Sequence, residues 1–480
     1  MRLDELVAGA SGVDRVVGDA SVAISELVYD SRKAGPGALF FCVPGEKVDG
    51  HDFALDVVEA GAAALVVERE LVVAAPQAVV ADARAAMAQL AARFHGDPTA
   101  TLRVVGVTGT NGKTTTAFLI REILESAGIR CGLLGTVKQV VAGVEEEVER
   151  TTPEAIDLQA TFRRMLDGGD AACVMEVSSH ALVLHRADAI HFEAALFTNL
   201  TQDHLDFHPD MESYFAAKRL LFEAGPGTAI VNVDDPYGRR LAEEFESVTF
   251  SAEGAEADYS ARDVSFDAGG AAFTVAGTEV QTMVPGHFNV ANALGALAAA
   301  ESLGIDREEA AAGLAVAAPP PGRFEPIDEG QGFAVLVDYA HTPDSVENVL
   351  RAARRLTGGR LIAVFGAGGD RDRDKRPKMG RAGAELADLV VVTSDNPRSE
   401  APAAIVAEVA AGAEGAKELE VEVDRRAAIA LALGRAAPGD TVVIAGKGHE
   451  QGQEFEAGRK IPFDDREVAR EELRKLGGPA

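Results

Sequence analysis

The sequence predicts an α/β protein of three domains, and three observations support this fold class. The chain has 480 residues, and at roughly 150 residues per domain that length suggests about three domains. Apolar residues make up 47% of the chain and Trp is absent, so Ala, Val and Leu must build the cores, as is normal for α/β proteins. Short apolar runs alternate with helical patterns, which favours mostly parallel sheets.

The first domain is expected over residues 1–98. ALFFCV at 38–43 and AALVV at 63–67 are typical of strands, and an Ala-rich helical stretch follows at 82–95. HGDPTA at 95–100 combines residues that favour turns. We therefore place a domain boundary there.

The second domain is expected over residues 99–321, with a central P-loop-type, mostly parallel sheet. RVVGVT at 103–108 reads as a strand that enters a glycine-rich turn, and a helix follows it. Further strands are expected at 173–177, 194–198 and 228–233. The Ala-rich stretch at 291–318 is typical of closely packed helices.

The third domain is expected over residues 322–480 and is Rossmann-like. APPPGRF at 318–324 predicts a rigid hinge, because each Pro fixes φ and removes a donor. Four strands then follow, at 334–338, 361–366, 389–394 and 441–446, with helical segments between them.

Charge and cysteine content exclude several classes of protein. The chain has 46 basic and 76 acidic residues and a net charge of −30, which repels nucleic acid and anionic membranes. The three cysteines fit neither a disulfide framework nor a zinc site. No apolar run approaches the ~20 residues that span a bilayer, and the N-terminus has no secretory signal pattern. We expect a cytoplasmic monomer with no nucleic-acid partner and no membrane insertion.

The stretch GVTGTNGKTTT at 106–116 predicts a phosphate-binding loop. Gly109 and Gly112 permit close backbone approach, Lys113 adds a positive charge, and Thr114 or Thr115 can hold Mg²⁺. The glycine that a Walker A loop has five places before its Gly-Lys pair is replaced by Val107. The alternative is a tight strand-to-helix turn without a ligand.

Three more residues of this domain are candidates. Glu176 ends an apolar run, where a carboxylate is costly unless it is paired or metal-bound, although it could also face solvent. His204 lies in the polar loop TNLTQDHLDFH at 198–208 and could be a metal or phosphate ligand. Zinc binding by His204 and His208 is disfavoured by Pro209. On its pattern alone, Lys218 is a surface lysine of an amphipathic helix.

Four motifs follow the strands of the third domain, and they should meet at one edge of its sheet. They are VDYAHTPDS at 337–345, FGAGGDRDRDKRP at 365–377, SDNPRSE at 394–400 and AGKGHEQ at 445–451. Arg371 and Arg398, with Asp395, Asn396 and Glu450, suit a zwitterionic ligand, because guanidinium groups bind carboxylates and carboxylates bind ammonium groups. Taken alone, DNPR could be a plain turn.

Taken together, these motifs resemble the Mur ligase family over essentially the whole chain. The resemblance rests on GTNGKTT, EVSSHAL, NLTQDHLDFH, the Lys218 helix, GHFNVANAL, PPGRFE, DYAHTPDS and DNPR. DNPR is similar to the motif of members that add meso-diaminopimelate. The resemblance implies an ATP-dependent ligase that joins meso-diaminopimelate to the D-Glu γ-carboxylate of UDP-MurNAc-L-Ala-D-Glu in peptidoglycan precursor synthesis.

The resemblance also implies roles for individual residues. Lys113, Glu176, His204 and Lys218 would be catalytic. Mg²⁺ would be held by Thr114 and Glu176, and a second ion would be served by His204 and by Lys218 as a carbamate (N6-carboxylysine). ATP would contact Gly109, Thr110, Asn111, Gly112, Lys113, Thr114, Thr115, Asn292, Arg323, Asp338 and His341. The UDP-MurNAc-dipeptide would contact Tyr29, Ser31, Glu46, Lys47, Val48, Thr151, Thr152, Ser178 and Arg186. Diaminopimelate would contact Arg371, Asp395, Asn396, Pro397, Arg398, Gly446 and Glu450.

Two alternatives to this function stay open at the level of sequence. A ligase of the same family could add lysine or extend folate with glutamate. A nucleotide-driven switch without amide chemistry would need the phosphate loop alone, but the motifs of the third domain argue against it.

Overall fold

The computed structural model describes residues 1–480 except 11, 46–47, 149, 268 and 478–480. The chain forms two compact units. One unit comprises Met1–Thr108, Ile129–Ala195 and Ala217–Gly227, and the other comprises Gly109–Gly128, Leu196–Ala216 and Thr228–Ala480. The predicted α/β class is confirmed, because the principal sheets are mixed or parallel and carry helices between their strands. The domain boundaries at 98/99 and 321/322 stay a prediction.

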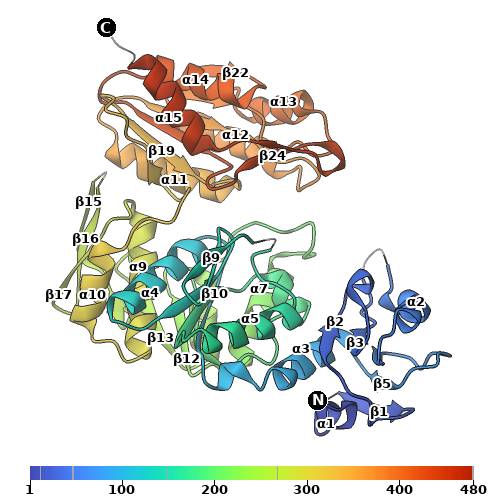
Figure 1. The fold of residues 1–480 in the computed structure, drawn as a ribbon. Coiled ribbons are helices and arrows are strands. Elements are labelled where there is room, and N and C mark those ends of the chain that lie inside the picture. Colours follow the sequence, from blue (N-terminus) through green and yellow to red (C-terminus); the bar gives the residue numbers. More distant parts are fainter. Residues whose placement is uncertain (11, 46–47, 149, 268, 478–480) are drawn as a thin grey trace. The chain divides into compact units, whose positions relative to one another are not determined.

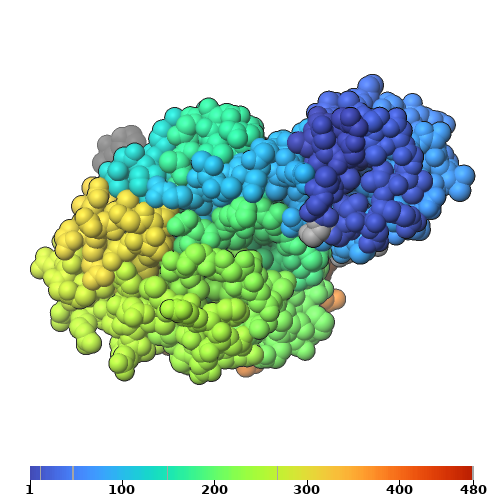
Figure 2. Space-filling model, turned by 90° about the horizontal axis from the view of Figure 1, so that it is seen from below, coloured from blue at the N-terminus to red at the C-terminus, as the bar shows by residue number. Residues whose placement is uncertain are grey.

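The N-terminal sheet has five strands, and β1 is its one antiparallel member. Its buried cores lie on both faces and include Leu39 and Phe41 on one face and Phe40 and Leu65 on the other. The residues of this sheet, blue in Figure 2, pack into one continuous body. The strands in spatial order are β1 (Val13–Val17), β5 (Gln77–Val80), β4 (Ala64–Val67), β3 (Ala38–Phe41) and β2 (Glu26–Val28), with helices α1 (Leu3–Val7), α2 (Ala54–Glu59) and α3 (Ala83–Phe94).

The central sheet has nine strands. Strand β10 pairs in parallel with β6 and β7, and β12, β13 and β14 are also parallel, whereas β8 and β9 continue as an antiparallel meander. The strands in spatial order are β14 (Tyr259–Ser260), β13 (Ser247–Ser251), β12 (Thr228–Asn232), β11 (Phe192–Phe197), β6 (Arg103–Thr108), β10 (Ala172–Glu176), β7 (Cys131–Leu134), β8 (Gln139–Val141) and β9 (Val144–Glu146).

The helices that accompany the central sheet are α4 (Lys113–Ser126), α5 (Ala155–Asp167), α6 (Ser179–Val183), α7 (Met211–Glu223), α8 (Pro236–Glu244), α9 (His287–Ser302) and α10 (Arg307–Val316). The expected close packing of the Ala-rich helices is confirmed, since α9 and α10 both pack on α4. A three-stranded antiparallel sheet of β15 (Arg262–Asp267), β16 (Gly270–Val275) and β17 (Thr278–Thr282) was not predicted.

The C-terminal sheet positions four of the predicted motifs. Strands β19, β23, β20 and β21 are adjacent and parallel, so their carboxyl ends share one edge, as expected. The strands in spatial order are β18 (Glu325–Pro326), β19 (Ala334–Asp338), β23 (Thr441–Ala445), β20 (Leu361–Phe365), β21 (Leu389–Val392) and β22 (Leu419–Val421). A hairpin of β24 (Gly452–Glu454) and β25 (Lys460–Pro462) follows.

Helices cover both faces of this sheet (Figure 1). Alternate strand residues explain this arrangement: Ala363 and Phe365 of β20 pack under the first helical layer, and Ile362 and Val364 pack under the second. The first layer is α11 (Pro343–Leu356), α12 (Lys375–Leu386) and α13 (Pro402–Gly412), and the second is α14 (Arg425–Arg435) and α15 (Asp465–Leu476). Among the described residues, no helix combines the length and apolar character needed to cross a bilayer.

Candidate active site

The loop that joins β6 to α4 needs its two glycines for steric reasons. Gly109 has φ +145, and a Cβ there would lie 1.9 Å from Thr198 Oγ1. Gly112 has φ +87, and a Cβ there would lie 2.4 Å from Asn292 Oδ1. Because L side chains rarely adopt either conformation, these positions favour glycine and keep the backbone accessible at the start of α4.

The side chains of Lys113 and Thr114 make hydrogen bonds within the protein. Lys113 Nζ donates to the carbonyl oxygens of Gly109 at 2.9 Å and Thr110 at 2.8 Å. Thr114 and Thr115 are buried, and Arg323 Nη2 donates to Thr114 Oγ1 at 3.1 Å. The loop is thus held in shape by its own lysine and by an arginine that follows the proline stretch.

The shifted glycine of the loop has a packing role. Gly106 lies inside β6, where a Cβ would come within 2.7 Å of the Phe192 ring. Val107 is fully buried in the same strand. The departure from the Walker A pattern therefore falls within the strand, before the loop begins.

Glu176 ends β10 and is 1% exposed, so the interpretation that it faces solvent is wrong. Its two carboxylate oxygens accept from the backbone N–H of Thr136 at 2.9 Å and from the Thr136 hydroxyl at 3.0 Å. In register, Glu176 lies beside Val107, two residues before Gly109 in the chain. A buried carboxylate at this strand end, with its oxygens oriented by hydrogen bonds, is a candidate ligand for a cation.

The threonines near Glu176 form a connected set with Ser178. Thr136 and Thr151 share a hydroxyl hydrogen bond at 3.0 Å. Thr152 Oγ1 donates to the Glu176 carbonyl oxygen at 2.9 Å and accepts from the Ser178 backbone N–H at 3.1 Å. Thr151, Thr152 and Ser178, which the resemblance assigns to one ligand, thus lie close together beside Glu176.

The two terminal nitrogens of the Arg186 guanidinium contact protein groups. Its Nη1 donates to the Thr152 carbonyl oxygen at 3.3 Å, and its Nη2 lies 2.8 Å from Glu154 Oε1. Burial lowers the pKa of Arg186, with Glu154 opposing that effect. Its Nε is buried without a hydrogen-bond partner among the described residues, which leaves one donor for a ligand.

The remaining candidates in the N-terminal part that the structure describes are partly buried or exposed. Tyr29 donates its hydroxyl to Asp157 Oδ2 at 2.9 Å. Ser31 begins the 3₁₀ turn Ser31–Lys33, which Asp30 caps, and Val48 is 53% exposed. Glu46 and Lys47 lie outside the described residues.

Lys218 lies on α7 and is 1% exposed, so its interpretation as a surface lysine is wrong. The sequence pattern hides this burial, because a lysine on an amphipathic helix usually extends its ammonium group to solvent. A lysine ammonium at this depth needs a partner or a change of chemical form.

His204 lies in a left-handed conformation, with φ +55. Its Nε2 is 3.4 Å from Asp203 Oδ2, and its ring meets that of Tyr214 edge-on at 6.0 Å. His208 is buried and stacks on the same tyrosine, whose hydroxyl lies 3.2 Å from Thr110 Oγ1. Within the described part of the chain, no three His, Cys, Asp or Glu residues form a group suited to a metal.

The residues expected near the nucleotide include two strongly buried polar groups. Asn292 Oδ1 accepts from Thr116 Oγ1 at 3.3 Å, and its amide donates to Asn289 at 2.8 Å. Burial raises the pKa of Asp338 to about 6, although Arg323 and the N–H groups of Phe324 and Ala340 favour its charged form.

Arg323 and His341 both contact Tyr339, the residue after Asp338. The Arg323 guanidinium lies 4.5 Å from the centre of the Tyr339 ring, and its buried Nε has no hydrogen-bond partner among the described residues. His341 Nδ1 lies 2.8 Å from the Tyr339 carbonyl oxygen, and burial lowers the pKa of His341.

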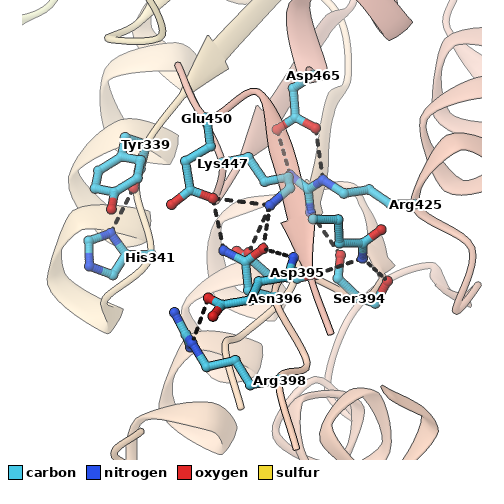
Figure 3. Close-up of polar contacts among 12 residues, drawn as sticks. Tyr339, His341, Ser394, Asp395, Asn396, Arg398, Arg425, Lys447, Glu450 and Asp465 are labelled. Atoms are coloured by element: carbon cyan, nitrogen blue, oxygen red, sulfur yellow. Dashed lines mark hydrogen bonds and ion pairs between the residues drawn. The ribbon is translucent and has the colours of Figure 1, made fainter. Parts of the chain in front are cut away.

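A polar cluster lies where β21 and β23 end (Figure 3). Asn396 Nδ2 donates to Glu450 Oε2 at 2.8 Å. Gly446 has φ +123, and a Cβ there would lie 2.7 Å from Asp395 Oδ2. Arg398 donates to Glu454 Oε2 at 3.1 Å and to the Gly369 carbonyl oxygen at 2.8 Å.

The structure brings Asp395, Asn396, Gly446 and Glu450 together and leaves Arg371 outside the cluster. The Arg371 guanidinium lies 3.6 Å from Asp206, and both side chains are exposed. The DNPR segment is therefore more than a plain turn, since two of its side chains are buried in contact with the 445–451 motif.

Three charged residues of this cluster were missed. Lys447 is fully buried and donates to Asn396 Oδ1 at 2.7 Å. Arg425 and Asp465 form a fully buried ion pair at 2.7 Å. Burial opposes ionisation of Asp395, but Lys447 and Arg425 hold its pKa below the ordinary value. The sequence feature that could have identified Lys447 as a site residue is its position between two glycines in AGKGHEQ.

The strand, phosphate loop and helix, with a second parallel sheet whose strand ends carry charged groups, define a P-loop-type α/β protein. Comparison with known proteins is more specific: the chain belongs to the Mur ligase family. The model of the Mur ligase family catalytic domain matches residues 23–95, the Mur ligase middle domain matches 107–300, and the glutamate ligase domain matches 322–448.

Curated relatives match over nearly their full length. A UDP-N-acetylmuramoyl-L-alanyl-D-glutamate--2,6-diaminopimelate ligase of Streptomyces coelicolor is 48% identical, covering 96% of this chain and 94% of the relative. The protein of the same name from Gloeobacter violaceus is 47% identical, covering 99% and 98%.

Solved structures match the whole fold. A structure of a UDP-N-acetylmuramoyl-L-alanyl-D-glutamate--2,6-diaminopimelate ligase has a TM-score of 0.72 at 33% identity and covers 100% of both chains. The MurF ligase of Thermotoga maritima in complex with ADP has a TM-score of 0.63 at 21% identity, covering 96% of this chain and 98% of that one. The second likeness concerns the fold alone.

Proposed function

We propose that this protein is an ATP-dependent ligase that joins meso-diaminopimelate to the γ-carboxylate of D-Glu in UDP-MurNAc-L-Ala-D-Glu, a step of peptidoglycan precursor synthesis. The observation that carries the proposal is similarity to ligases of that name at 47–48% identity over nearly the whole chain. The DNPR cluster at the edge of the C-terminal sheet supports the choice of acceptor.

The nucleotide would be bound by the loop from Gly109 to Thr115, with Asn292, Arg323, Asp338 and His341. The two glycines support this proposal, because a side chain at either would clash and close the loop. Arg323 supports it too, since its buried Nε needs an acceptor that a phosphate can supply.

The donor groups fit Mg²⁺, which prefers oxygen ligands. Thr114 offers a hydroxyl and Glu176 a buried carboxylate that the structure already stabilises through Thr136. His204 and Lys218 would serve a second ion, with Lys218 carbamylated. When bound, Mg²⁺ would neutralise charge on the phosphates of ATP.

Carbamylation would resolve the problem of a buried ammonium on α7. The Lys218 ammonium would first lose a proton to give the neutral amine. Reaction of that amine with CO₂ would form an N–C bond and release a second proton, so that a cation becomes a carboxylate-like anion. The 1% exposure of Lys218 supports this proposal, because burial disfavours the ammonium and protects the carbamate from water.

The muramoyl-dipeptide nucleotide would contact Tyr29, Ser31 and residues 46–48, and its peptide would contact Thr151, Thr152, Ser178 and Arg186. The Nε of Arg186, which no described residue engages, supports a role for this arginine as a donor to the anionic substrate. Diaminopimelate would contact Arg371, Gly446, Glu450 and the DNPR residues Asp395 to Arg398.

The reaction would proceed in two steps. The γ-carboxylate of D-Glu would attack the γ-phosphorus of ATP and release ADP, while Lys113 and the N–H groups of the loop stabilise the developing charge. The amine of diaminopimelate would then attack the acyl phosphate, lose a proton and expel inorganic phosphate, which leaves an amide.

An acceptor panel tests this function. The purified protein is given ATP, Mg²⁺ and UDP-MurNAc-L-Ala-D-Glu, and ADP release is measured with meso-diaminopimelate, L-lysine or L-glutamate. We expect release with diaminopimelate well above the other two. Preference for lysine would contradict the acceptor assignment, and hydrolysis indifferent to every acceptor would favour a switch. In a separate reaction with a folate in place of the muramoyl nucleotide, ADP release that depends on glutamate would favour the folylpolyglutamate alternative.

We also propose that the protein is a cytoplasmic monomer. The nucleotide-linked substrate supports the location, and the three buried cysteine thiols fit a reducing compartment. Cell fractionation and sedimentation test this, and a mass well above the 50.1 kDa of one chain would contradict the monomer.

A further inference from the structure

Lys447 occupies an unusual place at the end of β23. It is 0% exposed, although lysine is rarely fully buried without a partner. The glycines on both sides have positive φ, +123 at Gly446 and +55 at Gly448. A Cβ at Gly448 would lie 2.6 Å from the Gly322 carbonyl oxygen, so the backbone fits closely there and directs the lysine side chain into the cluster.

The Lys447 ammonium makes polar contacts with three acceptor oxygens. Its Nζ donates to Asn396 Oδ1 at 2.7 Å and to Glu450 Oε2 at 3.1 Å, and it lies 3.6 Å from Asp395 Oδ1. One ammonium thus compensates two carboxylates at the ends of two strands. These contacts engage the ammonium inside the protein (Figure 3). Because Lys447 is fully buried, its ammonium is not placed to contact the acceptor directly.

The contacts of Lys447 determine how its neighbours are oriented. Asn396 Oδ1 accepts from both Lys447 Nζ and the Glu454 backbone N–H at 2.9 Å, so the amide nitrogen must point the other way. That nitrogen donates to Glu450 Oε2 at 2.8 Å. Lys447 Nζ and Asn396 Nδ2 therefore both donate to Oε2 of Glu450.

The other oxygen, Glu450 Oε1, makes no hydrogen bond to any residue that the structure describes. The Glu450 side chain is 29% exposed, so this oxygen can meet a ligand. A carboxylate held through one oxygen and open at the other is suited to a substrate ammonium group.

We propose that Lys447 is a positioning residue for acceptor recognition. It would hold Asn396 and Glu450 so that Oε1 of Glu450 faces the ammonium group of the acceptor, without touching the acceptor itself. This inference rests on the proposed function, because it assumes an acceptor that carries an ammonium group at this cluster.

The test compares Lys447→Met with wild type and with Lys417→Met, which changes an exposed lysine just before β22 that pairs with Asp388. Loss of a charged hydrogen bond corresponds to about a 10- to 100-fold effect. We expect the KM for meso-diaminopimelate to rise by at least about tenfold in Lys447→Met. The KM for ATP should stay within about twofold of wild type, and Lys417→Met should resemble wild type in both.

A further readout separates positioning from general damage. It is the double variant Lys447→Met/Glu450→Gln. It removes the uncompensated charge and should show the same KM for diaminopimelate as Glu450→Gln alone, even if the single methionine variant fails to fold.

The outcomes are distinguishable from failure of the proposed function. If wild type does not use diaminopimelate in the acceptor panel, the function itself is wrong. If wild type does, the positioning role is overturned by an unchanged KM in Lys447→Met, by equal increases for ATP and diaminopimelate, or by a double variant clearly worse than Glu450→Gln.

Discussion

At the scale of single residues, the burial of a side chain distinguishes site residues from surface residues better than the residue type does. Lys218 lies between Ala217 and Arg219 in sequence and Lys447 lies between two glycines, yet both side chains are almost fully buried. Neither position shows this in its local pattern, because a lysine on a helix or in a loop is usually solvated. Their depth means that each is paired or chemically altered.

The Lys218→Ala variant tests the carbamate. We expect loss of most ligase activity, about 100-fold or more, because the anion that would position a metal ion is absent. Added short carboxylic acids such as acetate should restore part of the activity by occupying the space of the carbamate. Activity is measured as ADP release at saturating substrates.

The matched control for this variant is Lys378→Ala, an exposed lysine that donates to Gln202. It should keep wild-type activity and gain nothing from acetate. Full activity in Lys218→Ala, or equal stimulation of both variants by acetate, would contradict the carbamate.

At the scale of elements, the turn that enters α4 depends on two contacts that sequence does not display. Gly109 lies against Thr198 and Gly112 against Asn292, residues some ninety and 180 positions along the chain. The glycines therefore serve packing as well as approach to a phosphate. The same element also places Thr114 and Thr115 in its first turn.

Gly112→Ala should both destabilise the protein and weaken ATP binding. The new Cβ would lie 2.4 Å from Asn292 Oδ1 at a φ of +87, which forces a shift of the loop and costs about 1–3 kcal/mol of stability. We expect the KM for ATP to rise by about tenfold or more, since displaced N–H groups bind phosphate poorly.

Gly128→Ala provides the control at the other end of α4. Gly128 also has positive φ, +76, but a Cβ there meets nothing within 4 Å. It should lower the melting temperature modestly and leave the KM for ATP unchanged. Equal changes in both variants would mean that backbone strain alone explains the effect at Gly112.

At the scale of the whole molecule, sheet order decides which distant segments form one site. In the C-terminal sheet, β23 lies between β19 and β20, so segments near residues 339, 366, 393 and 446 emerge side by side. The buried Arg425–Asp465 pair ties this edge together, because Arg425 also donates to the carbonyl oxygens of Ser394 at 3.1 Å and Ala445 at 2.9 Å. Such an arrangement allows acceptor binding to be altered separately from ATP binding.

Arg398→Ala tests that separation. We expect the KM for diaminopimelate to rise about tenfold or more through loss of a guanidinium contact, with the KM for ATP within about twofold of wild type. The control is Arg426→Ala, an exposed arginine of the same domain that pairs with Glu471 and Glu472. Equal weakening of ATP and diaminopimelate binding by Arg398→Ala would indicate a structural role for the DNPR segment.

The sequence alone determined the α/β class, the strand and loop positions, and the convergence of the C-terminal motifs. Apolar runs and turn residues are local signals, and parallel strands place their carboxyl ends at one edge wherever they pair. The predicted strands at 334–338, 361–366 and 441–446 agree with the structure to within one residue. The glycine loop was equally easy to recognise, because its residues are contiguous.

Only the tertiary structure decided the depth of Glu176 and Lys218, the packing role of Gly106 and the place of Lys447. Each depends on residues far away in the chain, such as Phe192 beside Gly106 or Asn396 beside Lys447. The small sheet at 262–282 was missed for a related reason: its short strands become stable only through antiparallel pairing with one another. Burial and pairing are properties of the folded chain, so local patterns specify the elements and tertiary packing specifies which charges lie inside.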